Sequence, residues 1–235
     1  MKKLLLASIM LVMTLAGQAQ PAARFQPNES TVIKDSAGVV LPYLTWREMM
    51  TSGKYMLRSN AKAGAAPDFV MVKLSDSQIK LNRERFKPME SEYFTTGEAF
   101  KPFKEKDVTG QKWDTKALAG KIIVLNFWFI DCAPCRTEIP ELNQLVEKYG
   151  DKDVVFIAVA LDGSYEIKEF LKTLPYKYHI IDNGRSLANI YNMKNYPTNV
   201  IIDRQGKVKF HTSGYGPNTP YWIDKEIKAA LDLPQ

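Results

Sequence analysis

One stretch decides the fold of this chain, Ile122-Ile123-Val124-Leu125-Asn126-Phe127-Trp128 followed by Cys132-Ala133-Pro134-Cys135. Its first part is a near-continuous apolar run, which is typical of a strand buried on both faces of a parallel sheet. Apolar residues then recur at helical spacing from Glu138 to Tyr149, and Gly150 marks the end of that helix. The two cysteines therefore lie between a buried strand and a helix.

Strands and helices alternate around this stretch. The pattern predicts a turn between short strands at Val108–Trp113, strands over Val154–Ala160 and Tyr176–Ile181, helices over Glu166–Leu174 and Arg185–Tyr191, a hairpin over Val200–His211 and a closing helix over Trp222–Leu231. Alternating strands and helices imply parallel βαβ units, and a terminal hairpin adds antiparallel strands to the same sheet. We therefore predict an α/β fold with a central mixed β-sheet flanked by helices.

The bulk composition is that of a globular protein. Of 235 residues, 45% are hydrophobic and 25% are charged, which disfavours global disorder and suffices for one well-buried domain with an extension. The net charge of +6 is spread along the chain with acids among the basic residues, and no basic block or stripe follows the pattern of a phosphate backbone. Nucleic acid is therefore not an expected partner.

The N-terminus has the pattern of an export signal. Two lysines precede an apolar run from Leu4 to Leu15, and small or polar residues follow up to Ala19. This order predicts a signal peptide over residues 1–19, cleaved near Ala19, and a periplasmic or otherwise exported protein. Retention as a membrane anchor is the alternative, but the run is short for a helix that must cross ~30 Å of hydrocarbon.

Cys132 and Cys135 are the only cysteines of the chain. A disulfide between them closes too short a loop to stabilise an exported fold much, which favours a reactive pair. The N–H groups and dipole at a helix N-terminus favour an anion, here the Cys132 thiolate. We assign Cys132 as the attacking nucleophile and Cys135, one turn further, as the residue that resolves the mixed disulfide. Pro134 suits the first helical turn, where its missing N–H is not needed.

A Cys-x-x-Cys pair can also be half of a zinc site. His179 and His211 are candidate further ligands, but neither has ligand-type spacing, and each is better interpreted as a satisfied or surface residue. The position between a strand and a helix favours redox chemistry. No metal is expected, and no cofactor beyond the Cys132–Cys135 disulfide.

Several motifs resemble the thioredoxin superfamily, and more narrowly the TlpA/ResA-type periplasmic oxidoreductases. They are Val124–Trp128, Cys132–Arg136, Glu138–Pro140, Tyr196–Thr198, Ile201–Asp203 and Gly206–Val208. The resemblance covers roughly residues 95–235 and implies a thioredoxin-like fold with an extra helix and strand at about 166–181. We accordingly divide the mature chain into an N-terminal extension of unknown role over residues 20–91 and a thioredoxin-like domain over residues 92–235.

The resemblance also implies roles for residues around the cysteines. The match at Tyr196, Pro197 and Thr198 implies a cis-proline loop that faces the cysteines and binds the substrate backbone; without the resemblance, an ordinary strand-opening proline fits equally well. Trp128 is counted with this loop as a substrate contact. Glu138 matches the glutamate that is proposed to handle protons for the cysteines, and a solvated helix carboxylate is the alternative.

Two positions depart from relatives of this kind. Asn126 stands where thioredoxin itself keeps a buried aspartate, which shifts the proton-transfer role to Glu138 or water. Asp131 stands where many relatives have tryptophan, and an adjacent carboxylate should disfavour the Cys132 thiolate. Asp131 could also cap the helix. The dipeptide Ala133-Pro134 tunes the redox pair without settling the direction of electron flow.

The sequence thus predicts a periplasmic thiol–disulfide oxidoreductase of the protein-disulfide reductase type. Its expected partners are client proteins with disulfides and a membrane thiol–disulfide protein that donates electrons. The resemblance implies reduction, often in the maturation of c-type cytochromes. A disulfide oxidase or isomerase, and a non-catalytic thioredoxin-like binding module, remain the alternatives.

Overall fold

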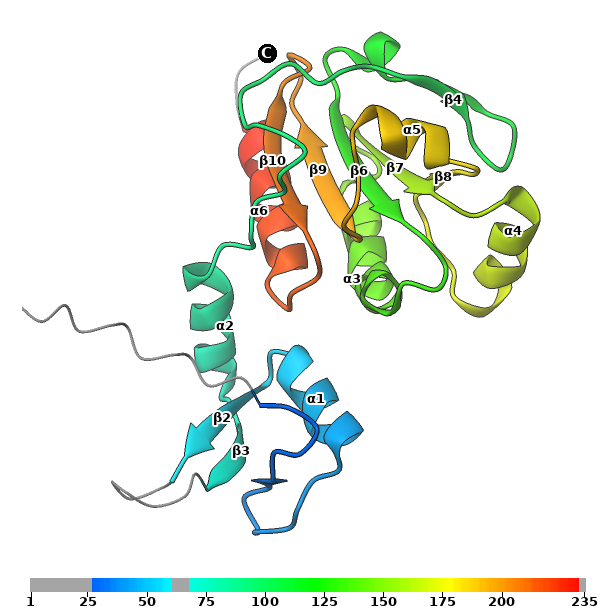
Figure 1. Cartoon of the computed structure of the whole chain (residues 1–235). Coiled ribbons are helices and arrows are strands. Elements are labelled where there is room, and N and C mark those ends of the chain that lie inside the picture. The colour runs from blue at the N-terminus through cyan, green and yellow to red at the C-terminus, as the bar shows by residue number, and fades with distance from the viewer. Residues whose placement is uncertain (1–26, 61–67, 233–235) are drawn as a thin grey trace, which may run out of the picture.

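The structure is a computed structural model that describes residues 27–60 and 68–232 of the chain. The predicted signal peptide lies outside the described residues. Two sheets of three and five strands and a separate two-stranded ribbon contain the described strands (Figure 1). The five-stranded sheet, its helices and the loops that connect them contain every residue predicted to take part in chemistry, so they position the site.

The five-stranded sheet has the order β10-β9-β6-β7-β8. Its strands are β6 (Ile122–Trp128), β7 (Val154–Ala160), β8 (His179–Ile181), β9 (Thr198–Ile202) and β10 (Val208–Ser213). The first three are parallel to one another, whereas β9 pairs antiparallel with β6 and β10 antiparallel with β9. The predicted mixed sheet with a terminal hairpin is therefore confirmed.

Helices cover both faces of this sheet because β6 is apolar on both sides. Ile122, Val124 and Trp128 pack into one cluster with residues of α3 (Ala133–Tyr149) and α6 (Thr219–Leu231). The alternate residues Ile123, Leu125 and Phe127 pack into a second cluster with residues of α5 (Arg185–Ile190). This period of two places Asn126 on the α3 side of the sheet.

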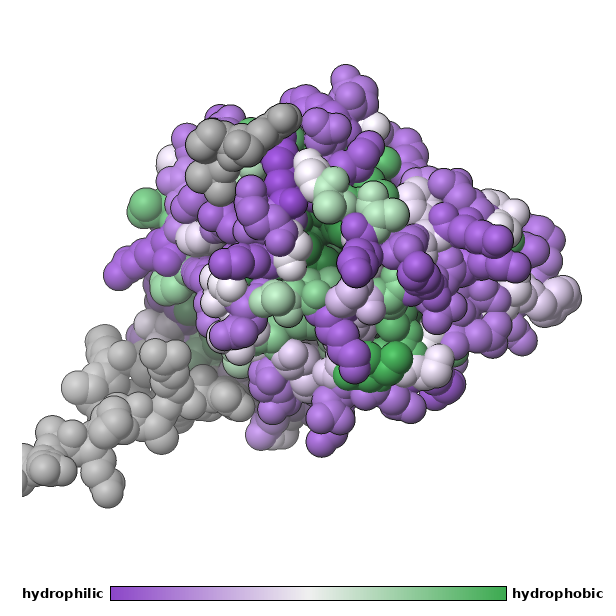
Figure 2. Space-filling view, turned by 90° about the horizontal axis from the view of Figure 1, so that it is seen from above, coloured by the Kyte–Doolittle hydropathy of each residue, from purple (hydrophilic) through white to green (hydrophobic). Residues whose placement is uncertain are grey.

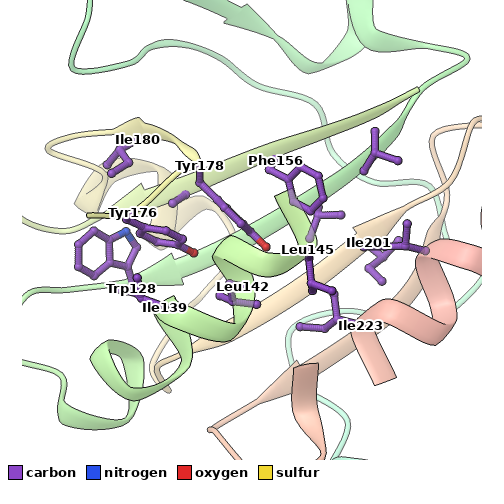
Figure 3. Packing of buried hydrophobic residues seen from close by; sticks show 14 of the residues in the cluster. Trp128, Ile139, Leu142, Leu145, Phe156, Tyr176, Tyr178, Ile180, Ile201 and Ile223 are labelled. Carbon is purple, nitrogen blue, oxygen red and sulfur yellow. The ribbon is translucent and has the colours of Figure 1, made fainter. Parts of the chain in front are cut away.

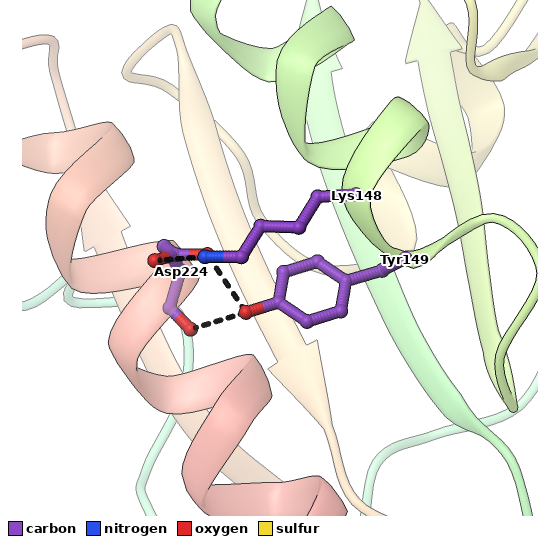
Figure 4. A network of polar contacts seen from close by, with 3 residues as sticks. All are labelled: Lys148, Tyr149 and Asp224. Carbon is purple, nitrogen blue, oxygen red and sulfur yellow. Dashed lines mark hydrogen bonds and ion pairs between the residues drawn. The ribbon is translucent and has the colours of Figure 1, made fainter.

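The cluster beneath α3 is the larger part of the core. Figure 3 shows Leu145 of α3 between Phe156 of β7 and Ile223 of α6, whereas Ile139 lies at the other end of the cluster beside Trp128. A polar network also joins the two helices at the surface. Asp224 of α6 accepts hydrogen bonds from Lys148 Nζ at 2.6 Å and from the Tyr149 hydroxyl at 2.8 Å (Figure 4).

The predicted extra helix and strand follow β7. They form α4 (Ser164–Thr173) and β8, but the strand is shorter than the predicted Tyr176–Ile181. Tyr176 and Tyr178 lie in the loop before the strand. Their rings are buried in the core, and their backbone is not part of the β7–β8 pairing. Before β6, β4 (Lys104–Lys106) and β5 (Lys112–Asp114) form the predicted turn between short strands, and the short helix η1 (Thr115–Leu118) follows.

The N-terminal extension folds into a small module of its own. We call residues 27–60 and 68–86 the N-terminal module. It contains β1 (Ile33–Lys34), α1 (Tyr43–Thr51), β2 (Tyr55–Ser59), β3 (Phe69–Lys73) and α2 (Asp76–Arg85). The strands form a sheet in the order β1-β3-β2, and Ile33, Trp46 and Met71 are the buried centre of its small core.

The two ends of the thioredoxin-like part differ in their surroundings. Seen from above, the end that carries the β9–β10 turn is covered mostly by hydrophilic side chains, with smaller apolar areas between them (Figure 2). The N-terminal module lies at the opposite end (Figure 1). No helix in the described part of the chain is long and apolar enough to span a membrane.

Candidate active site

The two cysteines form a disulfide at the first turn of α3. The S–S distance is 2.02 Å and the Cα–Cα distance is 5.2 Å. Cys132 is the N-cap residue, and its Sγ accepts a hydrogen bond from the backbone N–H of Cys135 at 3.2 Å. Cys132 is 5% exposed and Cys135 is 1% exposed, which agrees with attack by Cys132 and resolution by Cys135. The interpretation of Asp131 as the helix cap is wrong, because the cap is Cys132 itself.

A cis-proline loop lies at the same edge of the sheet. The Tyr196–Pro197 peptide bond is cis. Thr198 pairs with Phe127, so β9 begins beside the end of β6, where the chain leads on to Cys132. The Tyr196 ring packs edge-on against Phe129, with centroids 5.5 Å apart, and the Phe129 carbonyl accepts a hydrogen bond from Cys132 N–H. The predicted loop therefore lies next to the disulfide, and its proline is not an ordinary strand opener.

The residues predicted to contact the substrate differ in their exposure to solvent. Tyr196 is partly exposed, whereas Pro197 is buried and Thr198 is fully buried. The Thr198 hydroxyl donates to the Asn195 carbonyl at 2.8 Å and lies 2.8 Å from Ser213 Oγ, so it holds the loop in place. Trp128 is fully buried between Phe170 and Tyr176. The side chains of Thr198 and Trp128 thus offer no exposed surface here, and their assignment to the substrate contact stays a prediction.

Glu138 lies inside the protein one helical turn beyond Cys135. It is fully buried, which excludes a solvated helix carboxylate. Asn126 Nδ2 donates to its Oε1 at 2.7 Å, and Asn199 Nδ2 donates to its Oε2 at 3.2 Å. Burial raises the pKa of Glu138 to about 8, although the hydrogen bonds from Asn199 and Asn126 act in the opposite direction. The carboxyl group is therefore mostly protonated at neutral pH and titrates just above it.

Two asparagines on neighbouring strands build this carboxyl site. Asn126 and Asn199 are directly paired in the β6–β9 register, and Asn126 Nδ2 also donates to Asn199 Oδ1 at 2.9 Å. Sequence reasoning noted Asn126 but missed Asn199. The available signal was a polar residue that opens the otherwise apolar run Val200–Ile202. Both amide groups donate to the Glu138 carboxylate, so they favour its charged form and act against the effect of burial on its pKa.

Further polar groups lie buried near Glu138. Among the described residues, the hydroxyls of Tyr176 and Tyr178 and Nε1 of Trp128 are buried without a hydrogen-bond partner. The Tyr176 ring packs edge-on against Trp128 and at a tilt against Tyr178, and Figure 3 shows both hydroxyls directed towards the α3 side of the core. Burial raises the pKa of both tyrosines well above the usual value, with a further contribution from the Glu138 charge. Sequence reasoning assigned none of these hydroxyls a place near the site.

The histidines are engaged away from the cysteines. His211 Nδ1 accepts a hydrogen bond from Ser91 N–H at 3.1 Å. His179 packs on Trp113, with its Nδ1 3.7 Å from Asp107 Oδ2. Within residues 27–60 and 68–232, no group of three or more His, Cys, Asp or Glu side chains is arranged to hold a metal ion. Within this part of the chain the two histidines therefore do not join the cysteines in a metal-binding group.

Comparisons with known proteins match this part of the chain. The AhpC/TSA family model covers residues 96–211. Thiol-disulfide oxidoreductase ResA of Bacillus cereus is 38% identical over 43% of this chain and 60% of its own length. The ResA protein of Bacillus thuringiensis is 36% identical over 49% of this chain and 72% of its own length. This chain belongs to the ResA-type thioredoxin-like family.

A solved structure supports the ResA-type fold. The crystal structure of a candidate thiol:disulfide interchange protein DsbE from Chlorobium tepidum aligns with a TM-score of 0.55 at 29% identity, over 59% of this chain and 99% of its own. The chain spans only about 60% of the length of the first ResA relative. The N-terminal module lies before the region that the family model covers.

Proposed function

We propose that this ResA-type protein is an exported thiol–disulfide oxidoreductase that reduces disulfides in client proteins. The proposal rests on one observation, the Cys132–Cys135 disulfide at the first turn of α3 beside the cis Tyr196–Pro197 loop. A helix N-terminus stabilises a thiolate, and the loop offers backbone groups next to the sulfur that a client must reach. The names of the ResA and DsbE relatives support the same chemistry.

The exchange has two steps. In the reduced protein the Cys132 thiolate attacks one sulfur of a client disulfide, and the other client sulfur leaves as a thiolate. Cys135 then attacks Cys132 Sγ, which releases the client as a dithiol and forms the disulfide present in the structure. The client gains two electrons and two protons, and this protein loses two electrons. A thiol donor must reduce the pair again before the next cycle.

Glu138 is suited to manage the proton of Cys135. Cys135 must lose its proton to attack and must regain one on reduction, and both residues lie on the buried face of α3. A group with a pKa of about 8 can accept and return a proton near neutral pH. Asn126 and Asn199 position its carboxyl group. Asn126 stands where thioredoxin has a buried aspartate, and an amide cannot accept the proton. Glu138 therefore supplies the buried carboxyl group that does so in this protein.

The biological setting is part of the same proposal. Export into the periplasm follows from the predicted signal peptide, and a membrane thiol–disulfide protein is the proposed electron donor. Clients in the maturation of c-type cytochromes fit the ResA-type family. The disulfide supplies the redox chemistry without a separate cofactor. The dipeptide Ala133-Pro134 between the cysteines is the element that we expect to tune the reduction potential.

Insulin reduction by the dithiol form, with dithiothreitol as the electron source, tests the function. We expect turnover that disappears in Cys132→Ser. A measured potential near −270 mV supports a reductant, whereas a value near −120 mV supports the alternative of a disulfide oxidase. Insulin reduction that is equal with and without Cys132 contradicts the proposal and favours a binding module.

A further inference from the structure

The N-terminal module lies at the redox end of the sheet. β6 ends next to the start of β9, and β10 ends next to that same start of β9 at Ser213. The loop over residues 214–218 therefore emerges beside the cis-proline loop, and Gly214 N–H donates to the Pro197 carbonyl at 2.7 Å. Figure 1 shows the module below this end, with α1 and α2 nearest to the loop.

The module is packed directly on the loop over residues 214–218. Gly53 has a φ of +67°, and a Cβ there would lie 2.4 Å from Pro217 Cβ, so only glycine allows this approach. Asn218 Nδ2 donates to the Phe86 carbonyl, and Trp222 Nε1 donates to the Arg83 carbonyl at 2.8 Å. Backbone groups of the module are thus bonded to both the loop and α6.

The same loop is also joined to the active-site helix. The Tyr215 hydroxyl donates to Glu141 Oε2 at 3.2 Å, and Glu141 lies on α3 one turn after Thr137. Burial and the charge of Glu141 raise the pKa of Tyr215, and the charge of Arg83 on α2 partly offsets this effect. The loop over residues 214–218 therefore contacts the module, α3 and the cis-proline loop.

A groove opens at this junction. It has a volume of about 260 Å³ and is lined mainly by apolar side chains, among them Tyr55, Met56, Ile79, Phe86 and Pro217. Met56 is 41% exposed and Phe86 is 56% exposed. Eight of the ten large apolar side chains that are exposed among the described residues lie between positions 32 and 89, in or next to the N-terminal module, and two of them line the groove.

We propose that this groove binds an extended, apolar segment of the client polypeptide next to its disulfide. The inference rests on the proposed function. A client whose disulfide reaches Cys132 must lie at the edge that carries the cis-proline loop, and its chain then continues over the loop into the groove. β2 forms the wall from which Met56 projects, and it has no strand neighbour on its outer side among the described residues. An extended segment can therefore add backbone hydrogen bonds to that edge.

Two charge insertions in the groove test this inference. Met56→Glu and Phe86→Glu place a carboxylate where the apolar segment would lie, and both positions are exposed enough to tolerate the change. Val39→Glu is the matched control, because Val39 is 61% exposed on the same module but does not line the groove. Insulin serves as the protein probe, and 5,5′-dithiobis(2-nitrobenzoate) serves as a small disulfide that needs no groove.

We expect Met56→Glu and Phe86→Glu to lower kcat/KM for insulin by roughly tenfold each, through KM, and to leave reduction of the small disulfide unchanged. Val39→Glu should match the parent protein with both probes. Unchanged insulin kinetics in both groove variants overturn the inference and leave the proposed function standing. Reduction of the small disulfide that does not depend on Cys132 overturns the proposed function itself.

A second readout locates the segment directly. In Cys135→Ser protein, a mixed disulfide between Cys132 and an insulin chain should slow amide exchange in β2 and α2, whereas a mixed disulfide with glutathione should not. Equal exchange in the two adducts contradicts the inference. A parent protein that dimerises at micromolar concentration and becomes monomeric in Met56→Glu also overturns it, because the groove then belongs to a second copy of the chain.

Discussion

The titration of Glu138 gives the most quantitative prediction of this structure. Its pKa of about 8 lies far above the 4.5 of the unfolded chain because the carboxyl group is fully buried. Between these two values the folded protein keeps a proton that the unfolded chain has lost. Stability must therefore fall as the pH rises from about 4.5 towards 8 and then level off. Glu138→Gln removes the titration while keeping the shape of the side chain.

The size of the effect follows from the linkage relation. With a pKa of about 8 in the folded state and 4.5 in the unfolded state, the free energy of unfolding falls by roughly 3 to 4 kcal/mol between pH 5 and pH 8. This loss is absent in Glu138→Gln. The difference in unfolding free energy between the variant and the parent should thus grow by roughly 3 to 4 kcal/mol in favour of the variant over that range.

Urea unfolding of the oxidised protein at several pH values, followed by tryptophan fluorescence, measures this difference. The histidines titrate in both proteins and cancel in the comparison. Glu147→Gln is the control for the exchange of a carboxylate for an amide at an exposed position of the same helix. Parallel pH profiles for the parent and Glu138→Gln would refute a protonated, buried carboxyl group at this position.

Three further substitutions probe the surroundings. Asn199→Leu removes a donor to the Glu138 carboxylate, so the pKa of Glu138 should rise further and the plateau in stability should move to higher pH; an unmoved plateau contradicts this. Asp131→Asn removes a negative charge next to Cys132 and should speed its alkylation by iodoacetamide at pH 7 severalfold; an unchanged rate would show that Asp131 does not act on the thiolate. Asp224→Asn weakens the network of Figure 4 and should cost about 1 kcal/mol in urea unfolding, without changing the reduction potential.

The central sheet and the redox pair could be predicted because their signals are local. Two long apolar runs marked β6 and β7, and the cysteines fell between such a strand and a helix. The burial of Glu138 was also encoded locally. Cys135, Glu138, Ile139 and Leu142 form one buried helical stripe, so a carboxyl group on that stripe had to lie inside. The helical spacing of Glu138 with its buried neighbours could be read from the sequence. A lone glutamate on a helix is usually solvated, however, so the sequence left a buried and a solvated carboxyl group as alternatives.

Asn199 could not be assigned in the same way. Its contact with Asn126 depends on the register between two strands that are distant in sequence, and no local pattern fixes that register. Tyr176 and Tyr178 were misplaced in a strand because aromatic residues favour strands, whereas packing against Trp128 and Phe156 holds them in a loop. In each case a tertiary contact outweighed the local preference.

The N-terminal module was the least predictable part. Its strands are short, and β1 pairs parallel with β3 across a gap of more than thirty residues, so no local pattern fixes the order of the strands in this sheet. One signal was available for α2. Ser75 and Gln78 form a capping box in which the Ser75 side chain accepts from Gln78 N–H and the Gln78 side chain accepts from Ser75 N–H.

Capture of a client through one sulfur tests the central claim most directly. Reduced Cys135→Ser and Cys132→Ser proteins are each mixed with insulin, and the adducts are mapped by mass spectrometry without a reducing agent. The account predicts a stable mixed disulfide on Cys132 in the first protein and little adduct on Cys135 in the second, because Cys132 caps α3 and is the more exposed of the two sulfurs. Equal capture by the two variants, or capture by neither, contradicts it.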